Sequence, residues 1–207
     1  WKADNVLPLL SLPARRDDLA VLKPHADRFA KFEHVVVMGM GGSSLSGKTL
    51  VALKDQGFGP ARGRPKLWFM DNVDPATYAE LLARLPLDRT GFIAISKSGG
   101  TPETLVQLIA VLQGMEAKLG KGGLGAHVIA ITEKTANPLI RLAARLGCTV
   151  LEHDPNIGGR YSALSLVGIS VILSVGSLTQ LLAVHFNVGD LAMLVGVVIL
   201  AAYSVAG

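Results

Sequence analysis

Two loops rich in glycine and hydroxyl side chains are the parts of this sequence best suited to bind an anion. The first, MGMGGSSLSGK, covers residues 38–48 and follows a short run rich in β-branched residues. Its glycines allow a tight turn and a close approach of the backbone, and its serines place hydroxyls at the start of a predicted helix. Such a turn can serve a ligand or only pack a helix closely.

The second loop, SKSGGTPET at residues 96–104, carries three hydroxyls, a lysine and two glycines directly before another predicted helix. An anion bound there would meet backbone N–H donors, the positive end of the helix dipole and several side-chain hydroxyls. Capping of the helix by Thr101, with Pro102 in the first turn, would need one hydroxyl and no glycine pair. The loop therefore predicts an anion site built from Ser96, Lys97, Ser98, Gly99, Gly100 and Thr101.

A nucleotide site is an alternative interpretation of the first loop. GSSLSGKT at residues 42–49 has the spacing of a phosphate-binding P-loop, with Lys48 in the lysine position. Asp71, at the end of LWFMD, would then be the Mg²⁺ carboxylate of an NTPase. This interpretation leaves the second loop unexplained, and a chance match is the simpler account of the spacing.

The elements that position these loops alternate between strand-like and helix-like segments, joined by short connections and with no internal repeat. Residues 17–31 have a partly helical pattern that Pro24 should break or kink. Strands are predicted at 34–40, 66–70, 91–96, 127–131 and 149–152, and helices at 45–54, 75–84, 102–118 and 137–146. This order indicates an α/β fold: a three-layer parallel sheet with helices on both faces and ligands at the carboxyl ends of the strands.

A third motif, IGGRYSALSLVG at residues 157–168, completes a pattern of known type. Together the three motifs resemble the sugar isomerase (SIS) fold, which is flavodoxin-like or Rossmann-like, and specifically the glucose-6-phosphate isomerase family. GMGGSSL resembles the GIGGSxLG of that family, SKSGGTPET its SKSGGTxET, and GGRYS its GGRYS segment. The resemblance covers about residues 17–168.

The resemblance implies an isomerase that interconverts glucose 6-phosphate and fructose 6-phosphate in glycolysis and gluconeogenesis, cytoplasmic and commonly a homodimer. Carried over by position, Gly42, Ser43 and Gly159 would contact the substrate, and the second loop would hold its phosphate. Arg160 would be the catalytic residue beside the reacting carbons, where a guanidinium stabilises the negative charge of an enediolate. The alternative for Arg160 is a surface ion pair with an acid such as Asp154.

The catalytic set is incomplete in this chain. In the family, the glutamate base and the ring-opening histidine and lysine come from segments beyond the GGRYS motif. After Gly168 the sequence has no Glu and no Lys, and His185 lies in an apolar context. Glu103 belongs to the phosphate-loop helix, so we do not assign it as the base. We expect a fragment that binds sugar phosphate and is inactive alone; a non-catalytic SIS phosphosugar-binding module is the alternative.

The last part of the chain differs in composition, because Asp190 is its only formally charged residue after Arg160. Two apolar stretches, 169–184 and 191–207, approach the roughly 20 residues that a membrane-spanning helix needs. They predict a transmembrane-like helical hairpin, with a pair of buried core helices as the alternative. The FNxGDLxML…YSV pattern also resembles the EamA-type drug/metabolite transporter family. We therefore predict two parts, a sugar-phosphate domain at 1–168 and an apolar hairpin at 169–207, in a chimera joined near Gly168.

Composition argues against several other classes. The net charge is +4, but Lys and Arg are scattered without a basic run, so we expect no nucleic-acid partner. The five histidines show no metal-ligand spacing, and we expect no metal and no cofactor. Cys148 is the only cysteine, which excludes an internal disulfide and fits a buried structural thiol in a reducing compartment.

Overall fold

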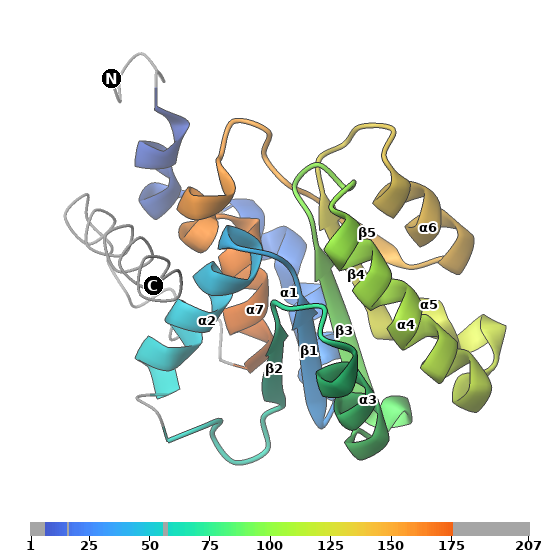
Figure 1. Cartoon of the computed structure of the whole chain (residues 1–207). Helices are drawn as coiled ribbons and strands as arrows, with labels where there is room; N and C mark the ends of the chain where they lie inside the picture. The colour runs from blue at the N-terminus through green and yellow to red at the C-terminus, as the bar shows by residue number, and fades with distance from the viewer. Residues whose placement is uncertain (1–6, 16, 56–57, 176–207) are drawn as a thin grey trace.

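The protein forms a parallel β-sheet with helices on both faces, in a computed structural model that describes residues 7–15, 17–55 and 58–175. The strand order is β2-β1-β3-β4-β5, and every neighbouring pair is parallel (Figure 1). The strands are β1 (His34–Met38), β2 (Lys66–Met70), β3 (Thr90–Ile95), β4 (Val128–Thr132) and β5 (Thr149–Glu152). The predicted α/β class and the five strand positions are confirmed.

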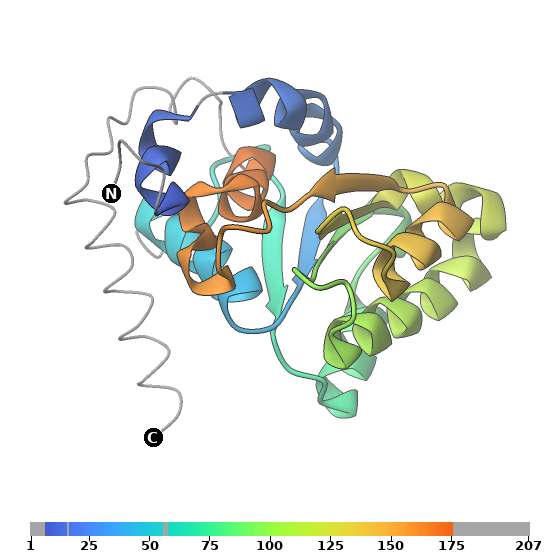
Figure 2. The same cartoon turned by 90° about the horizontal axis from the view of Figure 1, so that it is seen from above.

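The helices divide into two layers, one on each face of the sheet. The α-helices are α1 (Asp17–Phe29), α2 (Gly42–Asp55), α3 (Pro75–Arg84), α4 (Pro102–Leu119), α5 (Leu124–His127), α6 (Pro138–Leu146) and α7 (Leu166–Val175). Short 3₁₀ helices cover Pro8–Ala14 (η1), Leu87–Arg89 (η2), Lys121–Gly123 (η3) and Gly159–Leu164 (η4). Seen from above, α1, α2 and α7 lie on one side of the sheet and the α3–α6 layer lies on the other (Figure 2).

Alternation along the strands builds the two cores. Val35 and Val37 of β1 point to the layer of α1, α2 and α7, whereas Val36 and Met38 point to the other layer. All four side chains are fully buried. Two-sided burial explains why the central strands are continuous apolar runs rather than alternating ones.

Helix α1 runs through Pro24 to Phe29, so the predicted break does not occur. The side chain of Pro24 is exposed, whereas Leu22 and Phe29 of the same helix are buried against the sheet. Burial of that apolar face stabilises the helix despite the hydrogen bond that proline cannot donate.

The beginning of the apolar tail lies within the core of the α/β domain. Helix α7 crosses the predicted junction, and its Val167 and Val171 are buried in the same cluster as Leu50 of α2. Gly168, in the first turn of this helix, allows the backbone to approach Ala163 closely, because a Cβ there would lie 2.1 Å from the carbonyl oxygen of Ala163. The rest of the predicted hairpin and of the transporter-like pattern, residues 176–207, lies outside the described residues. In the part that the structure describes, no helix combines the length and hydrophobicity that crossing a membrane requires.

Cys148 lies between α6 and β5 and is partly buried. Burial raises the pKa of its thiol to about 11, so the sulfur stays protonated at neutral pH. This is consistent with a packing role for the residue.

Candidate functional site

The two anion-type loops begin side by side at the carboxyl edge of the sheet. They follow β1 and β3, which are neighbours, with Met38 paired to Ala94 at their ends. Gly39 keeps the loops close, because a Cβ on it would lie 3.1 Å from the carbonyl oxygen of Ile95. The helices that leave the loops, α2 and α4, therefore start at the same edge (Figure 1).

Hydrogen bonds within the second loop hold its hydroxyls together. The Oγ of Ser96 lies 2.8 Å from the Oγ1 of Thr101, and the N–H of Thr101 donates to Ser96 Oγ at 3.4 Å. The N–H of Gly100 donates to the exposed Ser98 Oγ at 3.3 Å. Thr101 is the N-cap residue of α4, but its side chain makes no capping hydrogen bond. Helix capping therefore does not account for this hydroxyl.

Gly99 is fixed by packing as well as by backbone conformation. Its φ is 64°, and a Cβ there would lie 2.0 Å from Asn137 Oδ1. Asn137 caps α6 by accepting a hydrogen bond from the N–H of Ile140, and its amide nitrogen donates to Thr132 Oγ1. Since the Gly99 carbonyl also accepts from the N–H of Leu139, the second loop is tied to the start of α6.

Lys97 directs its ammonium toward the protein itself. The Nζ donates to the carbonyl oxygen of Pro155 at 2.8 Å and lies 3.5 Å from the carboxylate of Glu133. The sequence predicts a phosphate contact for this side chain. In the structure it links the second loop to the turn that follows β5, and a phosphate contact from Lys97 stays a prediction.

The third motif packs directly on the first. It forms η4, and a Cβ on Gly42 would lie 2.1 Å from the Gly159 carbonyl oxygen and 2.7 Å from the Arg160 nitrogen. Ser162 Oγ donates to the same carbonyl oxygen at 2.7 Å, and Ser46 Oγ of α2 lies 3.3 Å from Ser162 Oγ. Gly42 is therefore a glycine because the backbone of the third motif occupies the place of its side chain.

Arg160 is exposed at the start of η4. Within the described part of the chain its guanidinium makes no ion pair, and Asp154, its expected alternative partner, pairs with Arg15 at 3.3 Å. The simple surface-pair interpretation is therefore wrong for this partner.

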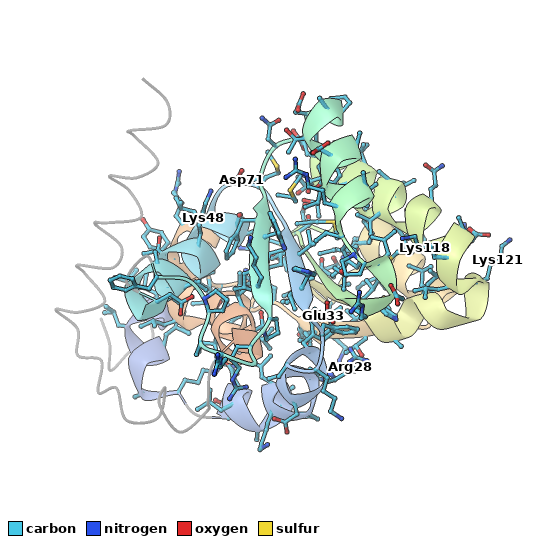
Figure 3. All side chains as sticks on the ribbon, turned by 90° about the horizontal axis from the view of Figure 1, so that it is seen from below. Arg28, Glu33, Lys48, Asp71, Lys118 and Lys121 are labelled. Atoms are coloured by element: carbon cyan, nitrogen blue, oxygen red, sulfur yellow. The ribbon has the colours of Figure 1, made fainter. Side chains whose placement is uncertain are left out.

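The P-loop alternative is contradicted by the local structure. Helix α2 begins at Gly42, so residues 42–49 are helical rather than a loop that cradles phosphates. Lys48 lies well inside this helix and its Nζ is 3.1 Å from Asp71 Oδ2 (Figure 3). The two charged groups that the nucleotide interpretation needs form an exposed ion pair with each other.

A parallel α/β sheet with three motifs joined at its carboxyl edge defines a sugar-isomerase type of domain. The model of the phosphoglucose isomerase family matches residues 24–186, and the chain belongs to this family. It is 38% identical over 144 residues to the glucose-6-phosphate isomerase of Carboxydothermus hydrogenoformans, covering 67% of this chain and 31% of that protein. The family match extends beyond the predicted junction at Gly168.

Solved structures agree with this assignment. A hypothetical protein from Thermus thermophilus superposes with a TM-score of 0.74 at 31% identity, covering 83% of this chain and 40% of the other. A glucose-6-phosphate isomerase from Chlamydia trachomatis gives a TM-score of 0.65 at 26% identity, covering 88% of this chain and 31% of the other. The chain thus spans well under half the length of these relatives.

Proposed function

We propose that this chain supplies the phosphate half-site of a glucose-6-phosphate isomerase, which interconverts glucose 6-phosphate and fructose 6-phosphate in glycolysis and gluconeogenesis. The observation that carries the proposal is the junction of all three motifs at one edge of the sheet. Gly39 lies against β3, Gly42 lies against Gly159, and Lys97 bonds to the turn before the third motif. Motifs separated by many residues are brought together where parallel α/β domains bind ligands.

The phosphate belongs at the second loop in this proposal. The hydroxyls of Ser96, Ser98 and Thr101 and the backbone of Gly99 and Gly100 surround the start of α4, an 18-residue helix. The first N–H groups of a helix lack partners within it, and its dipole favours an anion there. Ser43, at the start of α2, would contact the sugar.

Arg160 would act on the reacting end of the sugar. Aldose–ketose isomerisation forms an enediolate, and a guanidinium held near its oxygen stabilises the charge that develops in the transition state. The reaction also needs a carboxylate to move the proton between C2 and C1 and a group to open the ring. The segments that supply these groups in the family are not in this sequence, so we infer binding without turnover by the chain alone.

We also infer a cytoplasmic setting and a homodimer for the complete enzyme, since both follow from the family resemblance. The division at Gly168, and a membrane role for the apolar tail, remain proposals. A fractionation of the expressed chain between membrane and supernatant would test the second of them.

Calorimetric titration with glucose 6-phosphate and with inorganic phosphate tests the half-site. Replacing Thr101 with Val removes a hydroxyl that would bond to a charged group, which typically contributes about 1.5–3 kcal/mol, so affinity for both ligands should fall at least about tenfold. Thr77→Val is the matched control, because Thr77 Oγ1 bonds to Asp74 at the start of a different helix, α3. Absence of saturable binding, or equal losses in both variants, would refute the proposal. Binding without turnover after the missing family segments are restored would instead favour a non-catalytic phosphosugar module.

A further inference from the structure

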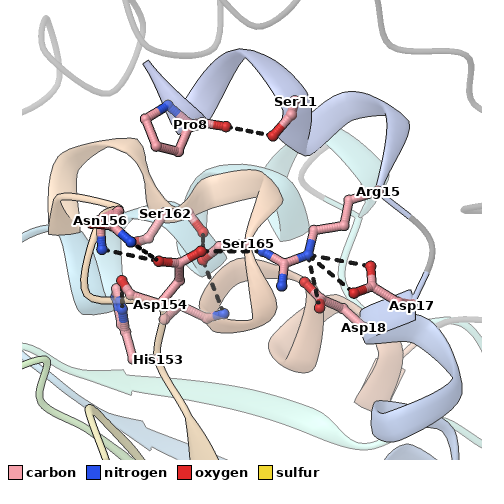
Figure 4. A network of polar contacts seen from close by, with 11 residues as sticks. Pro8, Ser11, Arg15, Asp17, Asp18, His153, Asp154, Asn156, Ser162 and Ser165 are labelled. Atoms are coloured by element: carbon pink, nitrogen blue, oxygen red, sulfur yellow. Dashed lines mark hydrogen bonds and ion pairs between the residues drawn. The ribbon is translucent and has the colours of Figure 1, made fainter. Parts of the chain in front are cut away.

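The turn between β5 and η4 is held by charged side chains from two sides. It covers residues 154–158 and leads directly into η4. From one side, Lys97 of the second loop donates to the Pro155 carbonyl oxygen at 2.8 Å. From the other side, Arg15 Nη1 lies 3.3 Å from Asp154 Oδ2 (Figure 4). Arg15 precedes α1 and is 139 residues away from Asp154 in the sequence.

Arg15 is anchored to its own segment by two further carboxylates. Its Nε lies 3.2 Å from an oxygen of Asp17 and 3.2 Å from one of Asp18. Burial alone would lower the pKa of Arg15, but Asp18, Asp17 and Asp154 together raise it above its ordinary value. The guanidinium is therefore a charged bridge between the start of α1 and the turn.

The two carboxylate oxygens of Asp154 have different partners. Oδ1 accepts the N–H of Asn156 at 2.9 Å and so closes the turn, whereas Oδ2 faces Arg15. Burial would raise the pKa of Asp154, but hydrogen bonds from Asn156 and Arg15 lower it below the ordinary range. The carboxylate is ionised at neutral pH, and its side chain is only 27% exposed, so the pair is partly shielded from solvent.

Backbone hydrogen bonds connect this turn to Gly159 and Arg160. The Asp154 carbonyl accepts from the N–H of the fully buried Ile157, and Gly158 then accepts from the N–H of Tyr161 as η4 begins. Gly159 and Arg160 lie within the turn of backbone that the second of these bonds closes. Their backbone is thus held by the turn on one side and by Gly42 on the other.

We propose that Arg15 is a positioning residue for the sugar end of the site, acting through Asp154 on the turn that presents Gly159 and Arg160. The role of Arg15 in sugar binding rests on the proposed function, whereas its effect on the turn does not. Arg15 lies outside the three motifs and outside the residues that match the family model, 24–186. The backbone of the second loop is tied separately to the start of α6, where the N–H of Leu139 donates to the Gly99 carbonyl, so it should not depend on Arg15.

Amide hydrogen exchange of the full chain tests the effect of Arg15 on the turn without any ligand. In Arg15→Ala, amide exchange in residues 156–162 should rise about tenfold, as expected for the loss of a charged hydrogen bond, while exchange in residues 96–104 stays unchanged. Asp154→Asn is a gentler variant that keeps an oxygen for the N–H of Asn156 and should loosen the same residues. Lys23→Ala is the matched control, since Lys23 pairs with Asp27 on the exposed surface of α1.

Ligand titration of the same variants separates positioning from general destabilisation. Arg15→Ala should weaken glucose 6-phosphate severalfold and leave the affinity for inorganic phosphate unchanged, with Arg15→Lys in between. Unchanged exchange in residues 156–162, or equal losses of affinity for the two ligands, would overturn the role of Arg15. If the wild-type chain binds neither ligand, the proposed function fails, and the exchange comparison still decides whether Arg15 holds the turn.

Discussion

Replacing Gly42 with alanine should damage both the stability and the site of this domain. The new Cβ would lie 2.1 Å from the Gly159 carbonyl oxygen, 2.3 Å from its carbonyl carbon and 2.7 Å from the Arg160 nitrogen. All three contacts are with backbone, which cannot rotate away as a side chain can. The start of α2 or the third motif must therefore move.

The size of the effect follows from two opposing terms. Inserting a methyl group into a packed region typically costs about 1–3 kcal/mol, and contact with backbone argues for the upper end. Alanine has a better helix propensity than glycine by up to about 1 kcal/mol, although Gly42 is only the first residue of α2. The net expected loss is about 2 kcal/mol, or a decrease in Tm of roughly 4–8 °C for a domain of this size.

Thermal and urea unfolding, followed by titration with glucose 6-phosphate, would measure both consequences. Gly114→Ala is the control. Gly114 lies inside α4, and a Cβ there would lie 3.5 Å from the Leu87 side chain, an ordinary van der Waals distance. That variant should be neutral or slightly stabilised. A Gly42→Ala protein with wild-type stability and affinity would show that the first and third motifs are not in the contact described here.

Two further predictions concern buried polar groups near the site. His153 is buried, and its Nδ1–H donates to the Asp154 carbonyl oxygen. Burial lowers the pKa of His153, so the folded protein favours the neutral imidazole. The stability that His153 contributes is therefore complete above its unfolded pKa of about 6.5 and is lost as the pH falls through the folded pKa. The urea midpoint should therefore fall between about pH 7.5 and 5 by more in the wild type than in His153→Leu; identical slopes would contradict this. Asn137→Ala removes the cap on Ile140 and a donor to Thr132, and should cost about 2 kcal/mol in urea unfolding. Asn137→Asp keeps the cap acceptor and should lie between the two, so equal stability of all three proteins would count against the network.

The strands and the loops could be predicted well from the sequence because their signals are local. Each β-branched run stops at glycine or a polar loop, and each following helix has a recognisable start, such as Pro75 or Pro102. The start of α2 is the exception: the sequence predicts a helix from Leu45, but the helix begins at Gly42. Glycine normally disfavours a helix, and only a distant segment, η4, explains why no larger residue fits there.

Contacts between polar groups far apart in the chain could not be predicted, because the sequence carries no pattern for them. Nothing near Arg15 predicts Asp154 as its partner, and nothing in the second loop predicts that the Lys97 ammonium turns to Pro155. The apolar tail shows a different limit. A helix that is hydrophobic all round is either buried or spans a membrane, and composition alone does not separate the two. The beginning of α7 is buried because it packs against both α1 and α2.

The position of α7 also bears on how the chain is made. During synthesis the sheet and helices α1 to α6 leave the ribosome before residues 166–175 do. Until then, the side of the sheet that carries Val35 and Ile95 lacks one of its covering helices. A nascent chain paused before Leu166 therefore displays a broad apolar surface, of the kind that chaperones bind and that promotes aggregation. The domain can close its core while still attached only after α7 itself has left the ribosome, so an earlier pause leaves this apolar face open.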